Sequence, residues 1–339
     1  MRDSIVKSKS EWQTILRKFN NKHDVYHNYE YLKLYENSEC DVEGYFFSDS
    51  EDFFFLPYLK KKIEGSSYFD FESAYGYGGP LTTSIDKDFL SRCWKKFKDK
   101  IYKEKIIAGI IRFNPILNSK KYLENIHIKK IYECKSVVLN CHEPLENVRG
   151  NYSNDIKQRL KKVDKNLISI SFNNKMDDLL KFYRIYNQRM HDLKADKDYF
   201  FSENYFKRFE NLNVENWKIM MLRYKDKIIG GALILFSKHI CSIHLSSSVK
   251  QFFNLSHNII IRDALIEFCF KKKIEFIHFG GGRTDKEDDT LLKFKEKFCK
   301  THKLYFLGGI VSNNKVYNEL INKNSFTNKY KNYFLKYRY

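Results

Sequence analysis

The sequence predicts an α+β fold in two domains, each with a mostly antiparallel central sheet flanked by helices. The chain has 339 residues, which is longer than a typical single domain. Hydrophobic residues make up 42% and aromatic residues 17%, so sizeable cores can form. Segments of strand and helix periodicity alternate in both halves of the chain. Pro144 marks a joint between the halves and sets the predicted domains at residues 1–145 and 146–339.

The first half contains the expected helices and strands in alternation. Ser10 is a preferred N-cap residue and predicts a helix that runs to about Phe19. Two Phe- and Tyr-rich runs separated by Ser48, Asp49 and Ser50 predict a β-hairpin. The hairpin strands are expected at residues 42–47 and 53–60, further helices at 29–35 and 86–103, and further strands at 106–112 and 136–139.

Residues 73–81 form a loop in which glycine and tyrosine alternate. A stretch with three glycines and a proline is neither an ordinary helix nor a central strand. It is either a tight turn with packed aromatic rings or a loop that contacts substrate through backbone N–H groups and tyrosine tips. The candidate binding residues are Tyr75, Gly76, Tyr77, Gly78 and Gly79.

The second half predicts a longer series of elements. A helix over residues 155–165, capped by Ser153 or Asn154, carries a concentrated positive face, although such a run is often only a solvated surface. The turn Lys225-Asp226 links two strands of a three-stranded meander. The expected strands are 167–172, 217–224, 227–236, 239–246, 276–279 and 304–310, and the remaining helices are 175–191, 202–212, 256–270, 291–298 and 315–322.

An apolar strand at residues 276–279 leads directly into three glycines, Gly280, Gly281 and Gly282. Glycine allows a close approach of backbone to a ligand, so this corner is a candidate binding site. It lacks the Gly-Lys-Ser/Thr ending of a P-loop. Arg283 at the turn and Lys295 on the following helix are the candidate catalytic cations, although each can also be an ordinary surface residue. Asp285 and Asp288 suit the start of that helix.

The formal net charge is +19, which favours polyanionic partners such as nucleic acid or an anionic membrane surface. The same bias can reflect an AT-rich genome, because Lys, Asn, Ile, Phe and Tyr are enriched together. The seven cysteines are scattered without metal-ligand spacing, so no metal site is expected. The N-terminus lacks the apolar region of a signal peptide, and no apolar run approaches the ~20 residues of a membrane span. We therefore expect a cytoplasmic location, and peripheral contact at the inner membrane face is an open alternative.

Several motifs occur in the order found in Fem-type proteins, the FemAB-like tandem GNAT transferases. They are Tyr75-Gly76-Tyr77-Gly78-Gly79-Pro80-Leu81, Arg112-Phe113-Asn114-Pro115, Gln158-Arg159-Leu160-Lys161-Lys162, Tyr199-Phe200-Phe201-Ser202 and His278-Phe279-Gly280-Gly281-Gly282 with Phe294-Lys295. The resemblance covers roughly residues 10 to 311. The second half also has the element order of a GNAT-type acyltransferase domain with an extra helix.

The resemblance implies transfer of an acyl or aminoacyl group to a primary amine, with acyl-CoA or aminoacyl-tRNA as co-substrate and no permanently bound cofactor. In the GNAT fold, the helix after the fourth strand offers its N-terminus to donor phosphates, which here implies Asn254, Ser256 and His257. Residues 249–254 lack a Gln/Arg-x-x-Gly-x-Gly/Ala pattern, and no inserted coiled-coil arm is present, so the donor class stays open.

The resemblance further implies an acceptor linked to a nucleotide or a lipid, such as an amino sugar of a surface polysaccharide or a peptidoglycan stem peptide. Arg112 and Tyr75 are then assigned to the acceptor side, and Arg189 is a further acceptor-side candidate. Partners also include tRNA and the inner membrane surface, and the oligomeric state is left open. The rival interpretation is a non-catalytic basic protein that binds RNA or a membrane surface.

Overall fold

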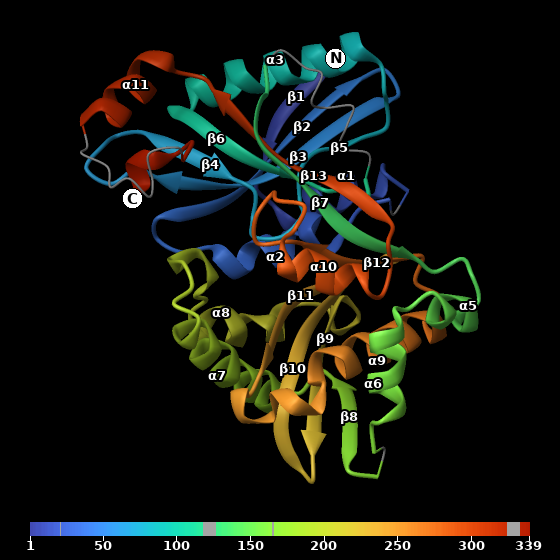
Figure 1. The fold of residues 1–339 in the computed structure, drawn as a ribbon. Coiled ribbons are helices and arrows are strands. Elements are labelled where there is room, and N and C mark those ends of the chain that lie inside the picture. The colour runs from blue at the N-terminus through green and yellow to red at the C-terminus, as the bar shows by residue number, and fades with distance from the viewer. Residues whose placement is uncertain (21, 118–126, 165, 324–332) are drawn as a thin grey trace. The chain divides into compact units, whose positions relative to one another are not determined.

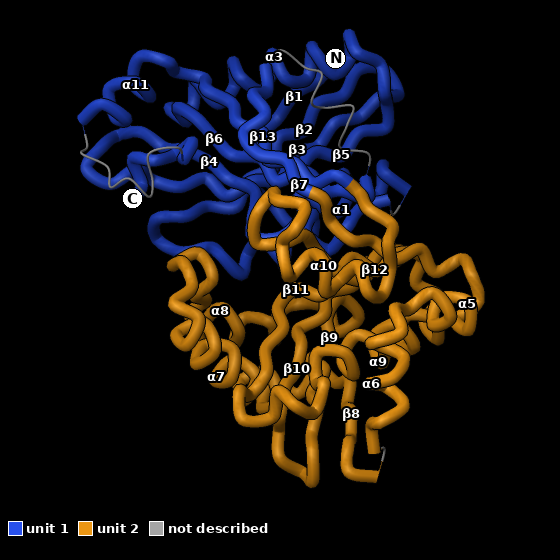
Figure 2. Tube along the Cα trace, in the orientation of Figure 1, with its two compact units in different colours: residues 1–134, 304–339 blue, residues 135–303 orange. Residues whose placement is uncertain are grey.

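The computed structural model describes residues 1–20, 22–117, 127–164, 166–323 and 333–339. The chain forms two compact units (Figure 2): unit 1 comprises Met1–Cys134 and Leu304–Tyr339, and unit 2 comprises Lys135–Lys303. The C-terminal segment therefore returns to unit 1, whereas the sequence boundary near residue 145 assigned it to the second domain. The division into an acceptor-side and a donor-side domain stays a prediction.

Unit 1 is built on a largely antiparallel sheet with strand order β1-β2-β3-β4-β6-β13, and β5 pairs with β3. The predicted hairpin is confirmed, because β2 and β3 pair antiparallel from Cys40↔Lys61 to Asp49↔Asp52. Only β4 and β6 run parallel among the pairs described in this unit. The strands are β1 Arg2–Val6, β2 Cys40–Asp49, β3 Asp52–Lys62, β4 Phe69–Glu72, β5 Leu81–Thr82, β6 Ile106–Phe113 and β13 His302–Val311.

Helices cover both faces of the unit 1 sheet (Figure 1). Alternate side chains of β3 point to opposite faces, as a pleated strand requires. Phe54 packs in the core beneath α3 (Lys87–Lys103), with its ring 5.1 Å from that of Trp94. Phe55 faces the other way and its ring lies 5.0 Å from Trp12 of α1 (Lys9–Arg17). The other helices of this unit are α2 Tyr29–Leu32 and α11 Asn314–Lys323.

Unit 2 has the strand order β7-β12-β11-β10-β9-β8. The predicted meander is confirmed, because β10 pairs antiparallel with both β9 and β11. Strand β10 is buried on both faces, against α9 on one side and α7 on the other, so residues 229–236 form a nearly continuous buried run. The strands are β7 Lys129–Asn140, β8 Ile168–Asn173, β9 Trp217–Tyr224, β10 Lys227–Phe236, β11 Ile240–Ser248 and β12 Phe276–Gly281.

The helices of unit 2 divide between the two faces of its sheet (Figure 1). On one face, α6 (Asn154–Lys161) and α9 (His257–Lys271) share a core with β9 to β12, and α10 (Thr290–Glu296) joins it through Leu292. On the other face lie α7 (Met176–Asp192) and α8 (Glu203–Lys207). Gly231 of β10 faces this second group, because a Cβ there would lie 3.1 Å from the ring of Phe182. The short helix α5 spans Leu145–Gly150.

Strands β11 and β12 pair only over their first residues. The parallel register runs from Ile240↔Phe276 to Ser242↔His278. Beyond this point β11 continues to Ser248, whereas Gly280 and Gly281 of β12 pair instead with β7. Strands β11 and β12 therefore splay apart after Ser242↔His278, as the fourth and fifth strands of the GNAT fold do, and beyond this point neither backbone pairs with the other.

Some predicted boundaries were wrong. Ser8, not Ser10, caps the first helix, because its hydroxyl accepts a hydrogen bond from the backbone of Glu11 at 3.3 Å. Strands β1 and β4 were not predicted, and β7 is longer than residues 136–139 because its first half is partly exposed and carries little apolar signal. Helix α6 ends at Lys161, so its predicted extension over residues 162–164 was wrong, and residue 165 lies outside the described residues.

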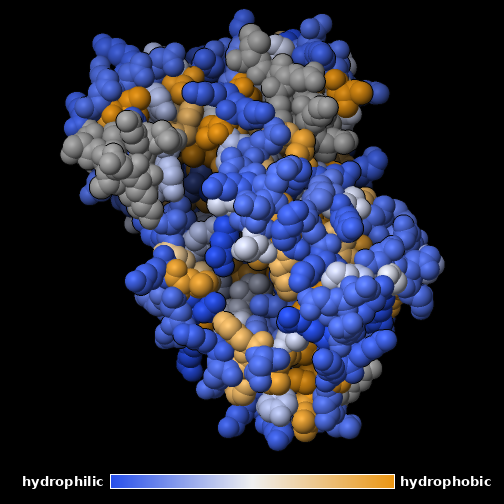
Figure 3. All heavy atoms as spheres, in the orientation of Figure 1, coloured by the Kyte–Doolittle hydropathy of each residue, from blue (hydrophilic) through white to orange (hydrophobic). Residues whose placement is uncertain are grey.

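No helix in the described part of the chain is long and apolar enough to span a membrane. The surface in Figure 3 is mainly hydrophilic, with separate hydrophobic groups. Large exposed hydrophobic residues include Ile85, Tyr102 and Val214, which lie far apart in the sequence.

Candidate active site

The glycine corner joins β12 to α10 in unit 2, and one carboxylate organises it. Asp289 Oδ2 accepts hydrogen bonds from the backbone N–H groups of Arg283 and Thr284, at 3.0 and 3.1 Å. Its Oδ1 accepts from the N–H groups of Leu291 and Leu292, both at 2.9 Å. These bonds hold the pKa of Asp289 below its ordinary value although partial burial raises it. Asp289 is therefore both the N-cap of α10 and the clamp of the glycine turn.

The glycines of this corner are required by its geometry. Gly280 has φ of +80°, a conformation that residues with a Cβ adopt at a cost. A Cβ on Gly282 would lie 2.7 Å from the carboxyl group of Asp289. The backbone can therefore follow this path only with glycine at these positions. Arg283 follows directly and is exposed, and its backbone N–H group is held by Asp289.

Lys295 reaches back from α10 onto this corner. Its Nζ donates a hydrogen bond to the carbonyl oxygen of Gly281 at 2.6 Å. The residue is only 7% exposed, which is uncommon for lysine and fixes the position of the charge. The structure thus places the predicted cation at the end of β12, beside the point where β11 and β12 separate.

His278 of β12 lies in the core. It is 2% exposed. Burial, together with the charge of Lys295, lowers the pKa of its imidazole to about 3. The ring is therefore neutral at pH 7 and too weak a base to accept a proton from an ammonium group.

The N-terminus of α9 follows β11 through a 3₁₀ turn, Lys250–Leu255. Ser256, at the N-cap position, adopts a left-handed conformation with φ of +55° and its side chain makes no capping hydrogen bond. Asn254 is exposed, whereas His257 is only 4% exposed, and its ring interacts with the backbone of Phe252. Burial lowers the pKa of His257, as do the charges of Arg262 and Arg189. An uncapped helix N-terminus with basic neighbours is suited to an anion.

The structure places Arg189 beside these residues. Its guanidinium lies 4.9 Å from the ring centroid of Phe253, and the ring of His257 lies 5.3 Å from the same phenyl ring. Arg189 was expected on the acceptor side from the sequence. In unit 2 it shares the neighbour Phe253 with His257, and its acceptor-side role stays a prediction.

The tyrosine–glycine loop of unit 1 packs tightly over two aromatic side chains. A Cβ on Gly76, which has φ of +115°, would lie 2.2 Å from the ring of Tyr26. The backbone carbonyl of Tyr75 accepts a hydrogen bond from the hydroxyl of Tyr31 at 2.5 Å. The ring of Tyr77 lies 5.8 Å from that of Tyr26, edge to face. Packing against the ring of Tyr26 therefore explains part of the glycine content of this loop.

A buried polar pair, Asn114 and Asp24, supports the same loop through hydrogen bonds. Asn114 Nδ2 donates to the carbonyl of Tyr77 at 2.8 Å and to Asp24 Oδ2 at 2.9 Å. Asp24 Oδ1 accepts from the backbone of Val25 at 2.7 Å. Gly79 has φ of +87° and lies against the backbone of Arg112. A Cβ on Gly79 would lie 3.1 Å from the carbonyl oxygen of Arg112. Gly78 has more room, since a Cβ there would lie 3.7 Å from its nearest neighbour, the backbone oxygen of Tyr26.

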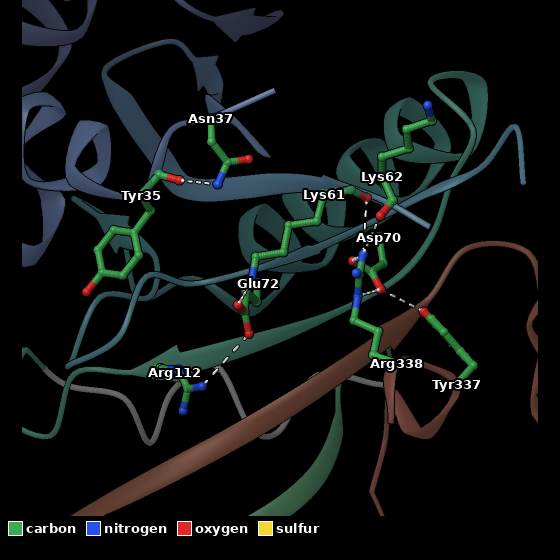
Figure 4. A network of polar contacts seen from close by, with 9 residues as sticks. All are labelled: Tyr35, Asn37, Lys61, Lys62, Asp70, Glu72, Arg112, Tyr337 and Arg338. Carbon is green, nitrogen blue, oxygen red and sulfur yellow. Dashed lines mark hydrogen bonds and ion pairs between the residues drawn. The ribbon is translucent and has the colours of Figure 1, made fainter. Parts of the chain in front are cut away.

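Arg112 of β6 belongs to a chain of charges across unit 1 (Figure 4). Its Nη2 lies 3.9 Å from Glu72 Oε2 of β4, and Glu72 also pairs with Lys61 of β3. Burial alone would lower the pKa of Arg112, but Tyr305 and Glu72 raise it overall, and Tyr75 contributes in the same direction. The predicted acceptor-side cation is therefore charged and lies within electrostatic reach of Tyr75.

Comparison with known proteins identifies part of this chain. Residues 150–295 match the acetyltransferase (GNAT) domain family. The fold is similar to that of FemX, with a TM-score of 0.71 and 11% identity over 94% of this chain and 99% of that one. It is also similar to the C-terminal domain of a putative lysylphosphatidylglycerol synthetase from Agrobacterium fabrum, with a TM-score of 0.57 and 13% identity over 91% and 94% of the two chains.

A tandem GNAT protein from the clavulanic acid biosynthesis pathway gives a TM-score of 0.54 at 4% identity, over 92% of this chain and 99% of that one. Comparison with curated protein sequences finds no match. These likenesses concern the fold, because all the identities are low.

The family match and the splayed sheet assign residues 150–295 to the class of GNAT-type acetyltransferase domains. Over its full length the protein has the fold of the Fem-type tandem GNAT proteins, as the resemblance of its motifs implied.

Sequence reasoning missed the residues that shape the two loops. Asp289, not Asp285 or Asp288, caps α10, because only its carboxylate reaches both sides of the turn. A local signal existed, since an acid directly before Thr290 is a common N-cap pattern. No local signal existed for Asp24 and Asn114, which are 90 residues apart in the chain.

Proposed function

We propose that the protein transfers an acyl or aminoacyl group to a primary amine of a cell-envelope precursor, such as an amino sugar of a surface polysaccharide or a peptidoglycan stem peptide. One observation carries the proposal: β11 and β12 separate after Ser242↔His278, and the buried Lys295 holds its ammonium group at the end of β12. A fixed cation beside unpaired strand backbone suits the charge that develops during acyl transfer.

The donor binds, in this proposal, with its phosphate at the N-terminus of α9. Asn254, Ser256 and His257 line that end of the helix, and Arg189 lies beside them. The absence of a glycine pattern in residues 249–256 is compatible with either acyl-CoA or aminoacyl-tRNA, because both donors carry phosphate. The donor is a co-substrate that is released after each turnover.

The reaction is direct attack of the neutral amine on the donor carbonyl. A C–N bond forms and a tetrahedral oxyanion develops, which Lys295 stabilises electrostatically. The C–S bond of a thioester or the C–O bond of an aminoacyl ester then breaks, and the proton lost by the amine ends on the leaving thiol or hydroxyl. Positioning supplies a large part of the rate, since no nucleophile of the protein is needed. Arg283, exposed at the turn, contacts an anionic group of a bound substrate.

The acceptor is assigned to the tyrosine–glycine loop and Arg112 of unit 1. The backbone of Gly280, Gly281 and Gly282 is a candidate substrate-binding segment within unit 2. Arg112 remains charged beside Tyr75, which suits a pyrophosphate or a sugar linked to it. A lipid-linked acceptor would bring this basic protein, with net charge +19, to an anionic membrane surface.

The test is a product assay with the purified full-length chain. Acetyl-CoA and a mixture of aminoacyl-tRNAs are each supplied with amino-sugar nucleotides and with nucleotide-linked stem peptides, and products are scored by mass. A mass increase that corresponds to one acyl or aminoacyl group, with one donor class, is expected. No product from any pair, together with salt-sensitive binding to arbitrary RNA, would instead support the non-catalytic alternative.

A further inference from the structure

Helix α3 of unit 1 presents a row of lysine side chains to the solvent. Its apolar side chains, such as Trp94 and Phe97, pack into the core on one face of the sheet (Figure 1). The side chains outside this apolar stripe are exposed or half-buried. The α3 lysine face, with a last member just beyond the helix end, comprises Lys95, Lys96, Lys98, Lys100, Lys103 and Lys105.

The charges of the α3 lysine face are not neutralised within the described parts of the chain. No carboxylate there lies at salt-bridge distance from any of its lysines, and Glu104, the C-cap residue of α3, pairs instead with Lys60 at 3.6 Å. On other helices the arrangement differs. Lys181 of α7, Lys207 of α8 and Lys271 of α9 each pair with a carboxylate four residues earlier. The α3 lysine face therefore offers free positive charge that these helices do not.

The pKa of His127 reflects a positive potential beside this face. His127 lies two residues before β7 and is half-buried. Burial, together with the charges of Lys98 and Lys95, lowers the pKa of its imidazole, and Asp99 acts in the opposite direction. Each of the two lysines acts more strongly than Asp99, so the field at this position is positive.

Two exposed side chains lie at the ends of the same helix. Ile85, which is 75% exposed, directly precedes the N-cap residue, and Tyr102, which is 56% exposed, lies in the last turn. Tyrosine is enriched where a membrane meets water, because its ring is apolar and its hydroxyl is polar. The helix has 17 residues and is about 25 Å long. Lying flat on a bilayer, it would bring its lysines to the headgroups with an apolar group at each end.

The chemistry of the face fits a lipid surface better than RNA. Sites for RNA use arginine forks and aromatic rings that stack on bases. The one arginine of α3, Arg92, is bound to Asp49 at 3.1 Å, and of the aromatic residues of this fully described helix only Tyr102 is exposed. Lysine supplies a point charge on a flexible stem, which suits headgroups without a fixed arrangement. Clusters of about four to eight basic residues on an amphipathic helix are typical of attachment to anionic lipids.

We propose that the α3 lysine face docks the protein on an anionic lipid bilayer. The contact is electrostatic and peripheral, because the apolar side of α3 belongs to the core of unit 1 and does not insert. The inference goes beyond the proposed function, since it assigns a surface to the membrane contact and needs neither an acyl donor nor an acceptor.

The test is co-sedimentation of the full-length protein with vesicles of phosphatidylcholine alone or with about 30% phosphatidylglycerol. The wild type should bind only the anionic vesicles, and more weakly as salt is added, because salt screens exposed charges. The triple variant Lys95→Gln/Lys96→Gln/Lys103→Gln should bind them about 100-fold more weakly, at roughly fivefold per lysine.

The matched control is Lys227→Gln/Lys238→Gln/Lys272→Gln, which removes the same charge from exposed positions of unit 2. It should weaken binding less than about fivefold, because charges far from the bilayer are screened. Both triple variants should keep the unfolding midpoint of the wild type, since exposed lysines contribute little to stability.

Absence of wild-type binding to the anionic vesicles would overturn the inference. Equal weakening by the two triple variants would also overturn it, because net charge alone would then account for binding. Binding of a short single-stranded RNA, weakened by the α3 variant while the anionic vesicles stay unbound, would assign the face to nucleic acid instead. The vesicles contain no donor or acceptor, so each of these outcomes leaves the proposed acyl transfer to its own product assay.

Discussion

At the residue scale, the protonation of Asp24 makes the support of the tyrosine–glycine loop in unit 1 depend on pH. It is 2% exposed and accepts hydrogen bonds from Asn114 and from the backbone of Val25. Burial raises the pKa of its carboxyl group from 3.8 to about 7, although both hydrogen bonds act in the opposite direction. The carboxyl group that supports Tyr77 through Asn114 is therefore partly protonated near neutral pH.

The stability of unit 1 should consequently depend on pH through Asp24. Its pKa is higher in the folded state than in the unfolded state, so its contribution to stability is complete below about pH 4 and is lost as the pH rises through 7. We expect the free energy of unfolding of the wild type to fall by a few kcal/mol between pH 5 and pH 8, relative to Asp24→Asn. Urea titrations of both proteins over this range measure the difference, and parallel curves would contradict the assignment.

Single residues were predictable where a local pattern required them. The glycines at 76, 79 and 280 were visible as a pattern, and the structure gives each a positive φ. The ring of Tyr26 against Gly76 was not visible in advance, because this contact depends on the tertiary fold. The roles proposed for Lys295, Arg283 and Arg112 come from their motifs and remain predictions.

At the scale of elements, the turn between β12 and α10 depends on Asp289. Replacing Asp289 with alanine removes the N-cap of α10 and leaves the N–H groups of Arg283 and Thr284 without this acceptor. We expect a loss of about 1–2 kcal/mol in the free energy of unfolding. Urea unfolding measures it.

Asp288→Ala is the control, because Asp288 is exposed and lies next to Asp289 in the same turn. It should change stability by less than ~0.5 kcal/mol. Equal effects of the two substitutions would show that Asp289 acts only through its charge near the helix terminus and not as a cap.

The order of elements in unit 2 could be read from the sequence, since β9 to β11 alternate with clear turn residues such as Lys225 and Asp226. The splay between β11 and β12 followed from the resemblance and not from periodicity. Helix ends were less predictable, because Ser8 and Ser10, or Asp288 and Asp289, are equally good caps by residue type. Tertiary geometry decides between them.

At the scale of the whole molecule, the C-terminal residues are tied into unit 1 (Figure 4). Arg338 donates two hydrogen bonds to Asp70, both at 2.6 Å, and the Tyr337 hydroxyl donates to the same carboxylate at 3.1 Å. The Asp70 side chain is 1% exposed. Burial raises its pKa, and Arg338 opposes this rise. The last residues of the chain thus neutralise a charge inside the first unit.

Removing the ion pair between Arg338 and Asp70 should lower the free energy of unfolding of unit 1. Arg338→Met leaves the Asp70 carboxylate buried without its cation, and we expect a loss of about 3–5 kcal/mol in the free energy of unfolding. The double variant with Asp70→Asn should recover most of it. Chemical denaturation measures all three proteins, and a loss below ~1 kcal/mol for Arg338→Met would contradict the role of this pair.

The return of residues 304–339 to unit 1 had no signal in the sequence. Residues 304–310 were predicted as a strand, but a strand pattern does not say which sheet it joins. Pairing of Phe306 with Phe113 and of Ile310 with Gly109 decides this through packing between distant segments. The boundaries of the two compact units therefore could not be predicted from composition alone.

The central claim, that Lys295 stabilises the charge formed during acyl transfer at the splayed strands, is tested most directly by the turnover number of Lys295→Ala. The assay uses the donor and acceptor that the product screen identifies, and Lys293→Ala, an exposed lysine on the same helix, is the control. We predict a fall in kcat of roughly 10²- to 10³-fold for Lys295→Ala, with little change in the KM for the donor, and an unchanged kcat for Lys293→Ala. Full turnover by folded Lys295→Ala would contradict the account.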